Sequence, residues 1–199
     1  MFQLFESIRL FDGVPGLIEF HQRRMDYSYT LLYDKPNPFF LSDIIIKENT
    51  KLKKLVKLKV SYSEENYACD FYLYNRKIIN SIKCVDVGKY NYNLKYTDRS
   101  FINNLRDKNN CYDDILMIKN DFVTDTSYCN IIFSDGDNWY VPQEPLFKGV
   151  QREFLIHKKL IKELRIRLTD ISKFEYFKLV NSMITFSDSE IRSTKKIHF

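Results

Sequence analysis

The chain has 199 residues, of which 44% are hydrophobic and 29% are charged, and its formal net charge is +5. This length can bury a core as one large domain or two small ones. No apolar run approaches the ~20 residues that a membrane span needs. The first residues carry no basic segment typical of a signal peptide. The sequence therefore predicts a globular cytoplasmic protein with no membrane partner.

The cysteines and histidines do not form a metal-binding pattern. The four cysteines are far apart, no Cys-x-x-Cys occurs, and the three histidines do not cluster. Metal binding and a disulfide framework are therefore not expected. We interpret the cysteines as free buried thiols, and they are Cys69, Cys84, Cys111 and Cys129.

The first elements of the chain predict a hairpin followed by a helix. Residues 4–11 have the pattern of a strand, and Asp12-Gly13 is a typical hairpin turn. Residues 14–18 are expected to form the returning strand of this hairpin. A helix is expected over residues 19–33, with one face formed by His21, Arg24, Ser28 and Leu31. A short helix is expected near residues 41–47.

A run of lysines between residues 51 and 59 contributes much of the positive charge. Such a run is compatible with a nucleic-acid patch. However, apolar residues alternate with Lys57, Lys59 and Ser61 over residues 55–62, which is typical of a half-buried strand. We therefore interpret the lysines as the solvated face of a strand and expect no nucleic-acid partner.

Strands at 55–62, 67–74 and 78–85 suggest an antiparallel meander. Residues 86–93 have the composition of a linker and include Gly88. These features predict an α+β protein with one domain at residues 1–88 and a second at residues 89–199. In the second, we expect a short helix at 99–108, strands at 114–119, 129–134 and 138–142, an amphipathic helix at 152–164 and a strand at 177–184.

Four polar features of the second half follow one another in the order that a pyridoxal 5′-phosphate (PLP) site requires. Lys95 offers an amine, Asp125 a carboxylate, Asn130 a pocket amide, and Gly149 a turn before a helix. Lysine binds PLP covalently, and a carboxylate keeps the pyridine nitrogen protonated. Backbone N–H groups at the start of a helix bind a phosphate.

The order and spacing of these residues resemble the class IV aminotransferases, the fold-type IV PLP enzymes. The segments Thr124-Asp125-Thr126-Ser127 and Leu146-Phe-Lys-Gly149-Val-Gln carry this resemblance, together with the opening segments 4–13 and 17–25. It covers most of the chain and is weakest at residues 35–93. It implies a D-amino-acid aminotransferase-like two-domain fold, with an N-terminal antiparallel sheet and helices and a C-terminal α/β pseudo-barrel.

The resemblance also implies the roles of residues in the second half. Lys95 would bind PLP and act as the general base after the substrate amine has replaced it. Asp125 would contact the pyridine nitrogen, although most of the family has Glu there, and Asn130 would orient the ring or a water. Asn130 is equally well interpreted as a satisfied turn amide. The phosphate would be bound by Gly149, Val150 and Gln151.

Further site residues are implied at other positions. Arg24 matches the phosphate-binding arginine of the first helix, with Arg23 facing solvent. Asn181 and Ser182 would form the last phosphate loop, and Ser7 would relay a proton. Substrate contacts with less support are Arg9, Tyr90 and Tyr92.

The family resemblance implies two activities. One is that of 4-amino-4-deoxychorismate lyase, which releases pyruvate and leaves 4-aminobenzoate for folate synthesis. The other is an aminotransferase acting on a branched-chain or D-amino acid. A degenerate protein that binds PLP without catalysis is a third alternative. Family members are usually homodimers, so a homodimer acting on a small amino substrate is expected.

Overall fold

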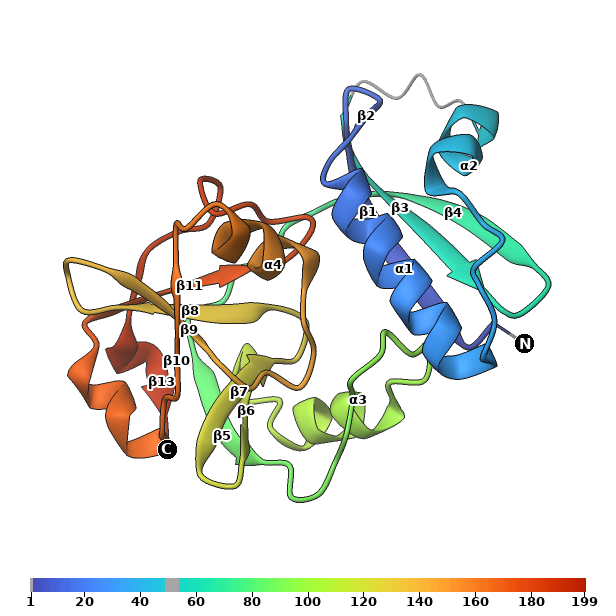
Figure 1. Cartoon of the computed structure of the whole chain (residues 1–199). Helices are drawn as coiled ribbons and strands as arrows, with labels where there is room; N and C mark the ends of the chain where they lie inside the picture. The colour runs from blue at the N-terminus through green and yellow to red at the C-terminus, as the bar shows by residue number, and fades with distance from the viewer. Residues whose placement is uncertain (1, 49–53) are drawn as a thin grey trace. The chain divides into compact units, whose positions relative to one another are not determined.

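The computed structural model describes residues 2–48 and 54–199, and it divides into two compact units (Figure 1). The first contains Met1–Asn75 and Leu94–Asp98, and the second contains Arg76–Asn93 and Arg99–Phe199. A boundary at residue 88 was expected. The observed division instead places residues 76–88 in the second unit and returns residues 94–98 to the first. Lys51, Leu52 and Lys53 of the lysine run lie outside the described residues.

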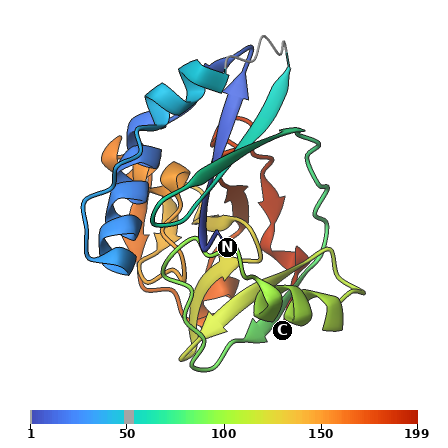
Figure 2. The same ribbon diagram turned by 90° about the vertical axis from the view of Figure 1, so that its right-hand side faces the viewer.

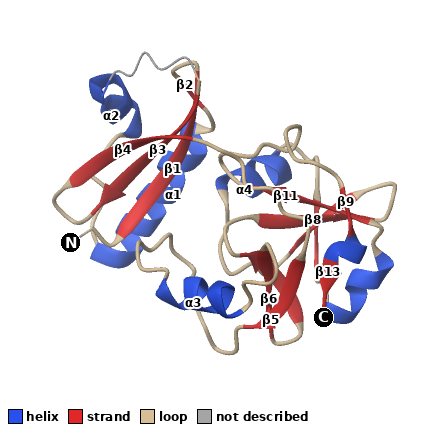
Figure 3. Ribbon diagram, turned by 180° about the vertical axis from the view of Figure 1, so that it is seen from behind, coloured by secondary structure: helices blue, strands red, loops and turns tan. Residues whose placement is uncertain are grey.

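The first unit is a four-stranded antiparallel sheet in the order β2-β1-β3-β4. Its strands are β1 (Leu4–Phe11), β2 (Val14–Pro15), β3 (Leu55–Tyr62) and β4 (Tyr67–Leu73), and its helices are α1 (Ile18–Tyr33) and α2 (Leu41–Glu48). In Figure 3, α1 runs along the sheet formed by β1 and β3. The predicted strand at 55–62 and the helix predicted to end at residue 33 are confirmed.

Alternation along the strands explains why one face of this sheet is buried. Every second residue of β1, from Leu4 to Leu10, is buried, and β3 buries Val56, Leu58 and Val60. The apolar side chains among these pack with Met25 and Tyr29 of α1 in one cluster. Burial of apolar side chains is the main stabilising contribution to such a core.

The expected buried face of α1 is only partly correct. His21 and Ser28 are buried, but Leu31 is 53% exposed. Met25 and Tyr29 are buried instead, so the face that contacts the sheet is rotated away from Leu31.

The second unit contains a nine-stranded mixed sheet. Its main path is β10-β9-β8-β7-β6-β5-β13, and β11 also pairs with β8 and with β12. Figure 2 shows the same chain turned by 90°. The strands are β5 (Ile82–Asp86), β6 (Asp114–Lys119), β7 (Phe122–Thr126), β8 (Asn130–Ser134), β9 (Trp139–Pro142), β10 (Lys162–Leu164), β11 (Tyr176–Val180), β12 (Arg192–Ser193) and β13 (Ile197–His198). The helices are α3 (Ser100–Lys108), α4 (Val150–His157) and the 3-10 turns η1 (Leu168–Lys173) and η2 (Thr194–Lys196).

The third strand of the predicted meander was placed in the wrong sheet. β5 does not pair with β4; it pairs in parallel with β6 and with β13. A parallel neighbour lies far along the chain, so the local alternation that identifies a strand does not identify its partner. The strands β7 and β12 and the parallel strand β13 were not predicted.

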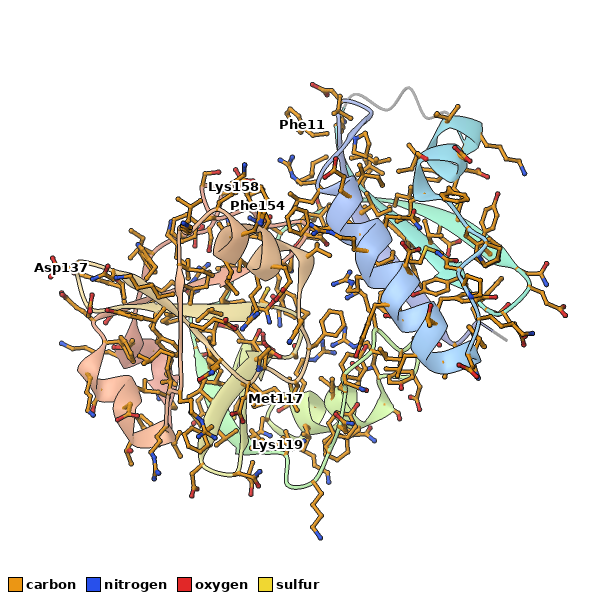
Figure 4. The ribbon with its side chains drawn as sticks, in the orientation of Figure 1. Phe11, Met117, Lys119, Asp137, Phe154 and Lys158 are labelled. Atoms are coloured by element: carbon orange, nitrogen blue, oxygen red, sulfur yellow. The ribbon has the colours of Figure 1, made fainter. Side chains whose placement is uncertain are left out.

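The predicted amphipathic helix at 152–164 is shorter than expected. α4 ends at His157, and residues 162–164 form β10 beside β9. Lys159 adopts a positive φ of 57°, and the N–H of Leu160 donates to the carbonyl of Leu155. This is the geometry that closes a helix at its C-terminus. Figure 4 labels Phe154 and Lys158 at this end of α4.

Candidate active site

The predicted site residues are divided between the two units. Ser7, Arg24 and Lys95 belong to the first unit. The second unit holds the other predicted residues, which are Asp125, Asn130, Gly149, Val150, Gln151, Asn181 and Ser182.

A buried carboxylate holds Arg24 in the first unit. Arg24 Nε donates to Glu6 Oε1 at 2.9 Å, and Arg24 Nη2 donates to Glu6 Oε2 at 2.5 Å. His21 Nδ1 lies 2.6 Å from Glu6 Oε2. Since the carboxylate accepts in this pair, the proton of the imidazole lies on Nδ1. The guanidinium is therefore fixed in orientation by two bonds to one rigid group.

The charges of this cluster are set by burial and by its partners. Burial alone would raise the pKa of Glu6, but the charge of Arg24 and the hydrogen bonds from His21 and Arg24 lower that pKa to about 2. Burial lowers the pKa of His21, and the charges of Arg24 and Lys95 act in the same direction. At neutral pH the cluster thus contains an ionised carboxylate, a neutral imidazole and a guanidinium.

The roles of Glu6 and His21 were not predicted, although the sequence holds a signal for each. Glu6 occupies the same strand parity as Leu4 and Ile8, so it had to be buried with them. A buried carboxylate requires a cationic or hydrogen-bonding partner. His21 precedes Arg24 by three residues, which places both on one side of the helix.

Lys95 lies beside the start of β1. Its carbonyl accepts from the N–H of Phe5 at 3.0 Å, and Tyr96 forms an isolated bridge with Leu4. Lys95 Nζ is 4.7 Å from the centroid of the Phe5 ring. Ser7 points to the same sheet face as Phe5, because the two are separated by one residue of a strand. The amine and the hydroxyl are thus both carried by the beginning of β1 and the segment paired to it.

In the second unit, Asp125 and Asn130 form a buried pair where β7 meets β8. The two residues face each other in the antiparallel register. Asn130 Nδ2 donates to Asp125 Oδ1 at 2.5 Å and to the carbonyl of Phe147 at 2.9 Å. The N–H of Phe147 donates to Asp125 Oδ2 at 2.8 Å. Asn130 therefore orients the carboxylate of Asp125 and is satisfied by that carboxylate and the backbone.

The environment of Asp125 makes its carboxylate unusually basic. Burial raises the pKa of Asp125 to about 7, and the hydrogen bonds from Phe147 and Asn130 and the more remote charge of Arg152 offset only part of that effect. A desolvated carboxylate gains more from a cationic hydrogen-bond donor than an exposed one does. Asp125 is thus suited to contact a protonated ring nitrogen.

The start of α4 is buried and closely packed against this pair. Gly149, Val150 and Gln151 are all buried, and Gly149 precedes the first helical residue. A Cβ atom at Gly149 would overlap the amide oxygen of Asn130. Only glycine fits this position without displacing Asn130. The helix start and the carboxylate are thereby held at one place in the second unit.

Arg152 anchors the same helix. It is 1% exposed, and Nη2 donates to the carbonyl of Pro142 at 3.1 Å and to Glu163 Oε1 at 2.5 Å. These bonds connect α4 to β9 and β10, so the position of the helix start is fixed by two strands.

Asn181 and Ser182 form the turn that follows β11. Asn181 Oδ1 accepts from the N–H groups of Met183 and Ile184, at 2.8 and 3.0 Å. Its Nδ2 donates to the carbonyl of Tyr128 at 3.3 Å and lies 3.2 Å from Cys129 Sγ. The side chain of Asn181 thus connects this turn to the β7–β8 connection, where Asp125 lies nearby in sequence.

The described part of the chain contains neither a metal-binding cluster nor a membrane-spanning helix. Residues 2–48 and 54–199 contain no group of three or more metal-binding side chains, and no helix within them is long and apolar enough to cross a membrane. All four cysteines are free, but only Cys129 is buried and Cys111 is exposed. The expectation of four buried thiols was therefore wrong.

Comparison with known proteins identifies the family. The model of amino-transferase class IV matches residues 86–188. An uncharacterised protein of Haemophilus influenzae is 35% identical over 185 residues, which cover 92% of this chain and 98% of that protein. The chain belongs to the class IV aminotransferase family. It is therefore an enzyme of a PLP-dependent family, and its α+β fold agrees with that of the solved members.

Two solved structures are similar over most of the chain. A Haemophilus somnus protein, provisionally named a 4-amino-4-deoxychorismate lyase, has a TM-score of 0.89 and 31% identity, covering 94% of this chain and 98% of that one. The PLP-bound form of a hypothetical Mycobacterium tuberculosis aminotransferase has a TM-score of 0.73 and 14% identity, covering 95% of this chain and 79% of that one. The second likeness concerns the fold alone.

The residues of this class IV enzyme fit PLP. Asp125 is a desolvated carboxylate oriented by two hydrogen-bond donors. Gly149 allows close packing at the start of α4. These groups match a pyridine nitrogen and a phosphate in charge and hydrogen-bonding type.

Proposed function

We propose that this class IV enzyme is a PLP-dependent lyase that converts 4-amino-4-deoxychorismate into 4-aminobenzoate and pyruvate. The observation that carries the proposal is the likeness to the Haemophilus somnus protein, at a TM-score of 0.89 and 31% identity over nearly the whole of both chains. The provisional name belongs to that protein, and its transfer to this chain rests on the shared length, fold and sequence.

We assign the cofactor contacts residue by residue. Lys95 binds PLP covalently, Asp125 contacts the pyridine nitrogen, and Asn130 fixes Asp125. Bound PLP supplies an electron sink for the carbon next to the substrate amine. The phosphate contacts are assigned to Arg24, to Gly149, Val150 and Gln151 at the start of α4, and to Asn181 and Ser182.

The reaction requires two proton movements and the loss of one bond. The Lys95 amine removes the proton from the ring carbon that carries the substrate amine. The neighbouring C–O bond then breaks, the ring becomes aromatic, and the enol of pyruvate leaves. The methylene carbon of this enol takes up a proton, which we assign to a relay through the Ser7 hydroxyl. No second substrate is needed.

The role of Ser7 has its own test. Ser7→Ala should slow the release of pyruvate while leaving the affinity for PLP unchanged, because Ser7 contributes to the proton relay alone. Equal turnover by Ser7→Ala and the wild type would remove Ser7 from the mechanism.

The activity is tested by offering the purified protein with PLP both classes of substrate. We expect 4-amino-4-deoxychorismate to give equal amounts of 4-aminobenzoate and pyruvate without any keto acid. Branched-chain and D-amino acids with 2-oxoglutarate form the second arm. Turnover in the second arm alone would assign the protein as an aminotransferase. PLP binding without turnover in either arm would make it a degenerate member of the family.

A further inference from the structure

The sheet face that carries Ser7 also carries a pair of lysines from β3. In the antiparallel register, Ser7 lies opposite Lys59 and Arg9 lies opposite Lys57. The residues between them, such as Leu58 and Ile8, point to the buried face under α1. Since side chains alternate along a strand, the four polar residues share the face of the sheet that is turned away from α1.

Neither lysine is neutralised within residues 2–48 and 54–199. Lys57 Nζ lies 4.7 Å from the centroid of the Tyr72 ring and Lys59 Nζ lies 5.5 Å from that of Phe5, but neither amine forms an ion pair with a described residue. Asp70 is opposite Lys59 on β4, yet it does not come within ion-pairing distance. On this face, the ammonium groups of Lys57 and Lys59 therefore lie near aromatic rings, and neither is ion-paired with a carboxylate of a described residue.

The two charges also disfavour each other. Burial lowers the pKa of Lys57, and the positive charge of Lys59 lowers it further. An anion bound between the two ammonium groups would relieve this repulsion.

The same face is connected to the proposed reactive amine by one aromatic ring. Lys59 Nζ and Lys95 Nζ lie 5.5 and 4.7 Å from the centroid of the Phe5 ring. The distance between the two nitrogens cannot exceed the sum of these two lengths. A small molecule whose amine is at Lys95 can therefore extend along the Phe5 ring and place a distant group at Lys59.

We propose that Lys57 and Lys59 form a carboxylate-binding subsite, which selects substrates whose carboxylate is remote from the reacting amine. The inference rests on the proposed function for the position of that amine at Lys95. An ordinary α-amino acid carries its carboxylate on the same carbon as its amine. A ring amine with a carboxylate across the ring holds the two groups on opposite sides of that ring. Lys57 and Lys59 thus determine specificity and take no part in proton transfer.

The subsite is tested with two probes that differ in one charge. 4-Aminobenzoate and its neutral analogue 4-aminobenzamide are titrated calorimetrically into the protein purified with PLP. We expect the wild type to bind 4-aminobenzoate at least about tenfold more tightly, since a charge-assisted contact has that effect on a dissociation constant. Lys59→Met and Lys57→Met should each reduce this preference and should leave 4-aminobenzamide binding unchanged.

The matched control is Lys47→Met, which removes one charge from the exposed side of α2. It should keep the preference of the wild type. Equal binding of the two probes to the wild type, or an equal loss in Lys47→Met and Lys59→Met, would overturn the proposal. A preference kept in full by both Lys57→Met and Lys59→Met would show that the lysines only cover Phe5 and Tyr72, and it would also overturn it.

Two further outcomes separate this proposal from its alternatives. Binding of a double-stranded DNA oligonucleotide that is lost in both variants, with no preference for 4-aminobenzoate, would assign the face to nucleic acid and contradict the subsite. A preference for 4-aminobenzoate in a protein that does not convert 4-amino-4-deoxychorismate would support the subsite and refute the lyase. The failure of one proposal is therefore distinguishable from the failure of the other.

Discussion

The two units each bury a carboxylate, and the two carboxylates respond to burial in opposite ways. Glu6 is fully buried and has a pKa lowered to about 2, whereas Asp125 is 4% exposed and has a pKa raised to about 7. Glu6 receives two bonds from the guanidinium of Arg24. Asp125 receives its bonds from an amide side chain and a backbone N–H. The charge of the donor, and not the depth of burial, decides the sign of the shift.

This contrast suits the two proposed tasks. The charge of Glu6 is paired with the guanidinium of Arg24, so Glu6 holds the Arg24 side chain in position. Asp125 has hydrogen bonds but forms no ion pair with a described residue, so its carboxylate can interact with a protonated ring nitrogen. One carboxylate is a support for a binding residue, and the other is a binding residue itself.

Glu6→Gln should give the largest loss of stability. Removing one partner of a buried ion pair costs about 3 kcal/mol. A carboxyl with a lowered pKa stabilises the fold above its unfolded pKa of 4.5, and this contribution is lost as the pH falls towards 2. The loss caused by Glu6→Gln should therefore be largest at pH 7 and smaller by about 2 kcal/mol at pH 3. Urea unfolding of the cofactor-free protein at both pH values measures it.

The control is Glu65→Gln, which changes an exposed side chain of the same unit. It should alter the free energy of unfolding by less than about 0.5 kcal/mol. A loss in Glu6→Gln that is the same at pH 3 and pH 7 would mean that Glu6 is not ionised in the folded protein.

Asp125→Asn should have the opposite pH signature. The folded pKa of Asp125 lies above its unfolded value of 3.8, so the folded protein binds more protons between pH 4 and 7 and loses stability as the pH rises. In the cofactor-free wild type, the raised pKa of Asp125 should lower the free energy of unfolding by about 2.5 kcal/mol as the pH rises from 5 to 8. Asp125→Asn should remove that part of the slope, while Asp137→Asn in an exposed turn should not. Identical slopes for Asp125→Asn and the wild type would contradict the basic carboxylate.

Arg24→Ala should weaken PLP binding about tenfold or more, because it removes a charge-assisted contact to the phosphate. Arg24 also neutralises Glu6, so this variant should be less stable as well. Arg23→Ala is the matched control, since Arg23 is exposed and lies over the Phe20 ring at 4.3 Å. PLP titration of each cofactor-free variant gives the comparison. Equal weakening by both variants would remove Arg24 from the phosphate contacts.

The sequence predicted correctly the strands that can be recognised from their own residues, but not where α4 ends or which strand pairs with β5. The alternation at 55–62 predicted β3 because each inward residue is apolar. The predicted strand at 114–119 is confirmed as β6, although it is buried along its length instead of alternating. The end of α4 was missed because apolar residues continue with helical spacing past His157, where Lys159 turns the backbone. The partner of β5 was missed because parallel pairing depends on residues distant in sequence.

The candidate residues followed from the family motif, but their connections followed only from the structure. The sequence placed Asp125 and Asn130 five residues apart without indicating that one orients the other. It placed Glu6 on β1 and Arg24 on α1 without indicating that they form an ion pair. Both contacts depend on how a helix or a second strand packs, which a single sequence does not specify.

The most direct test of the central claim is the identity of the lysine that binds PLP. Purified protein is incubated with PLP, reduced with borohydride and digested, and the labelled peptide is sequenced by mass spectrometry. We predict that Lys95 carries the label and that Lys95→Ala protein is neither labelled nor active. A label on Lys59, Lys119 or another lysine, or a Lys95→Ala protein that is still labelled, would contradict the account.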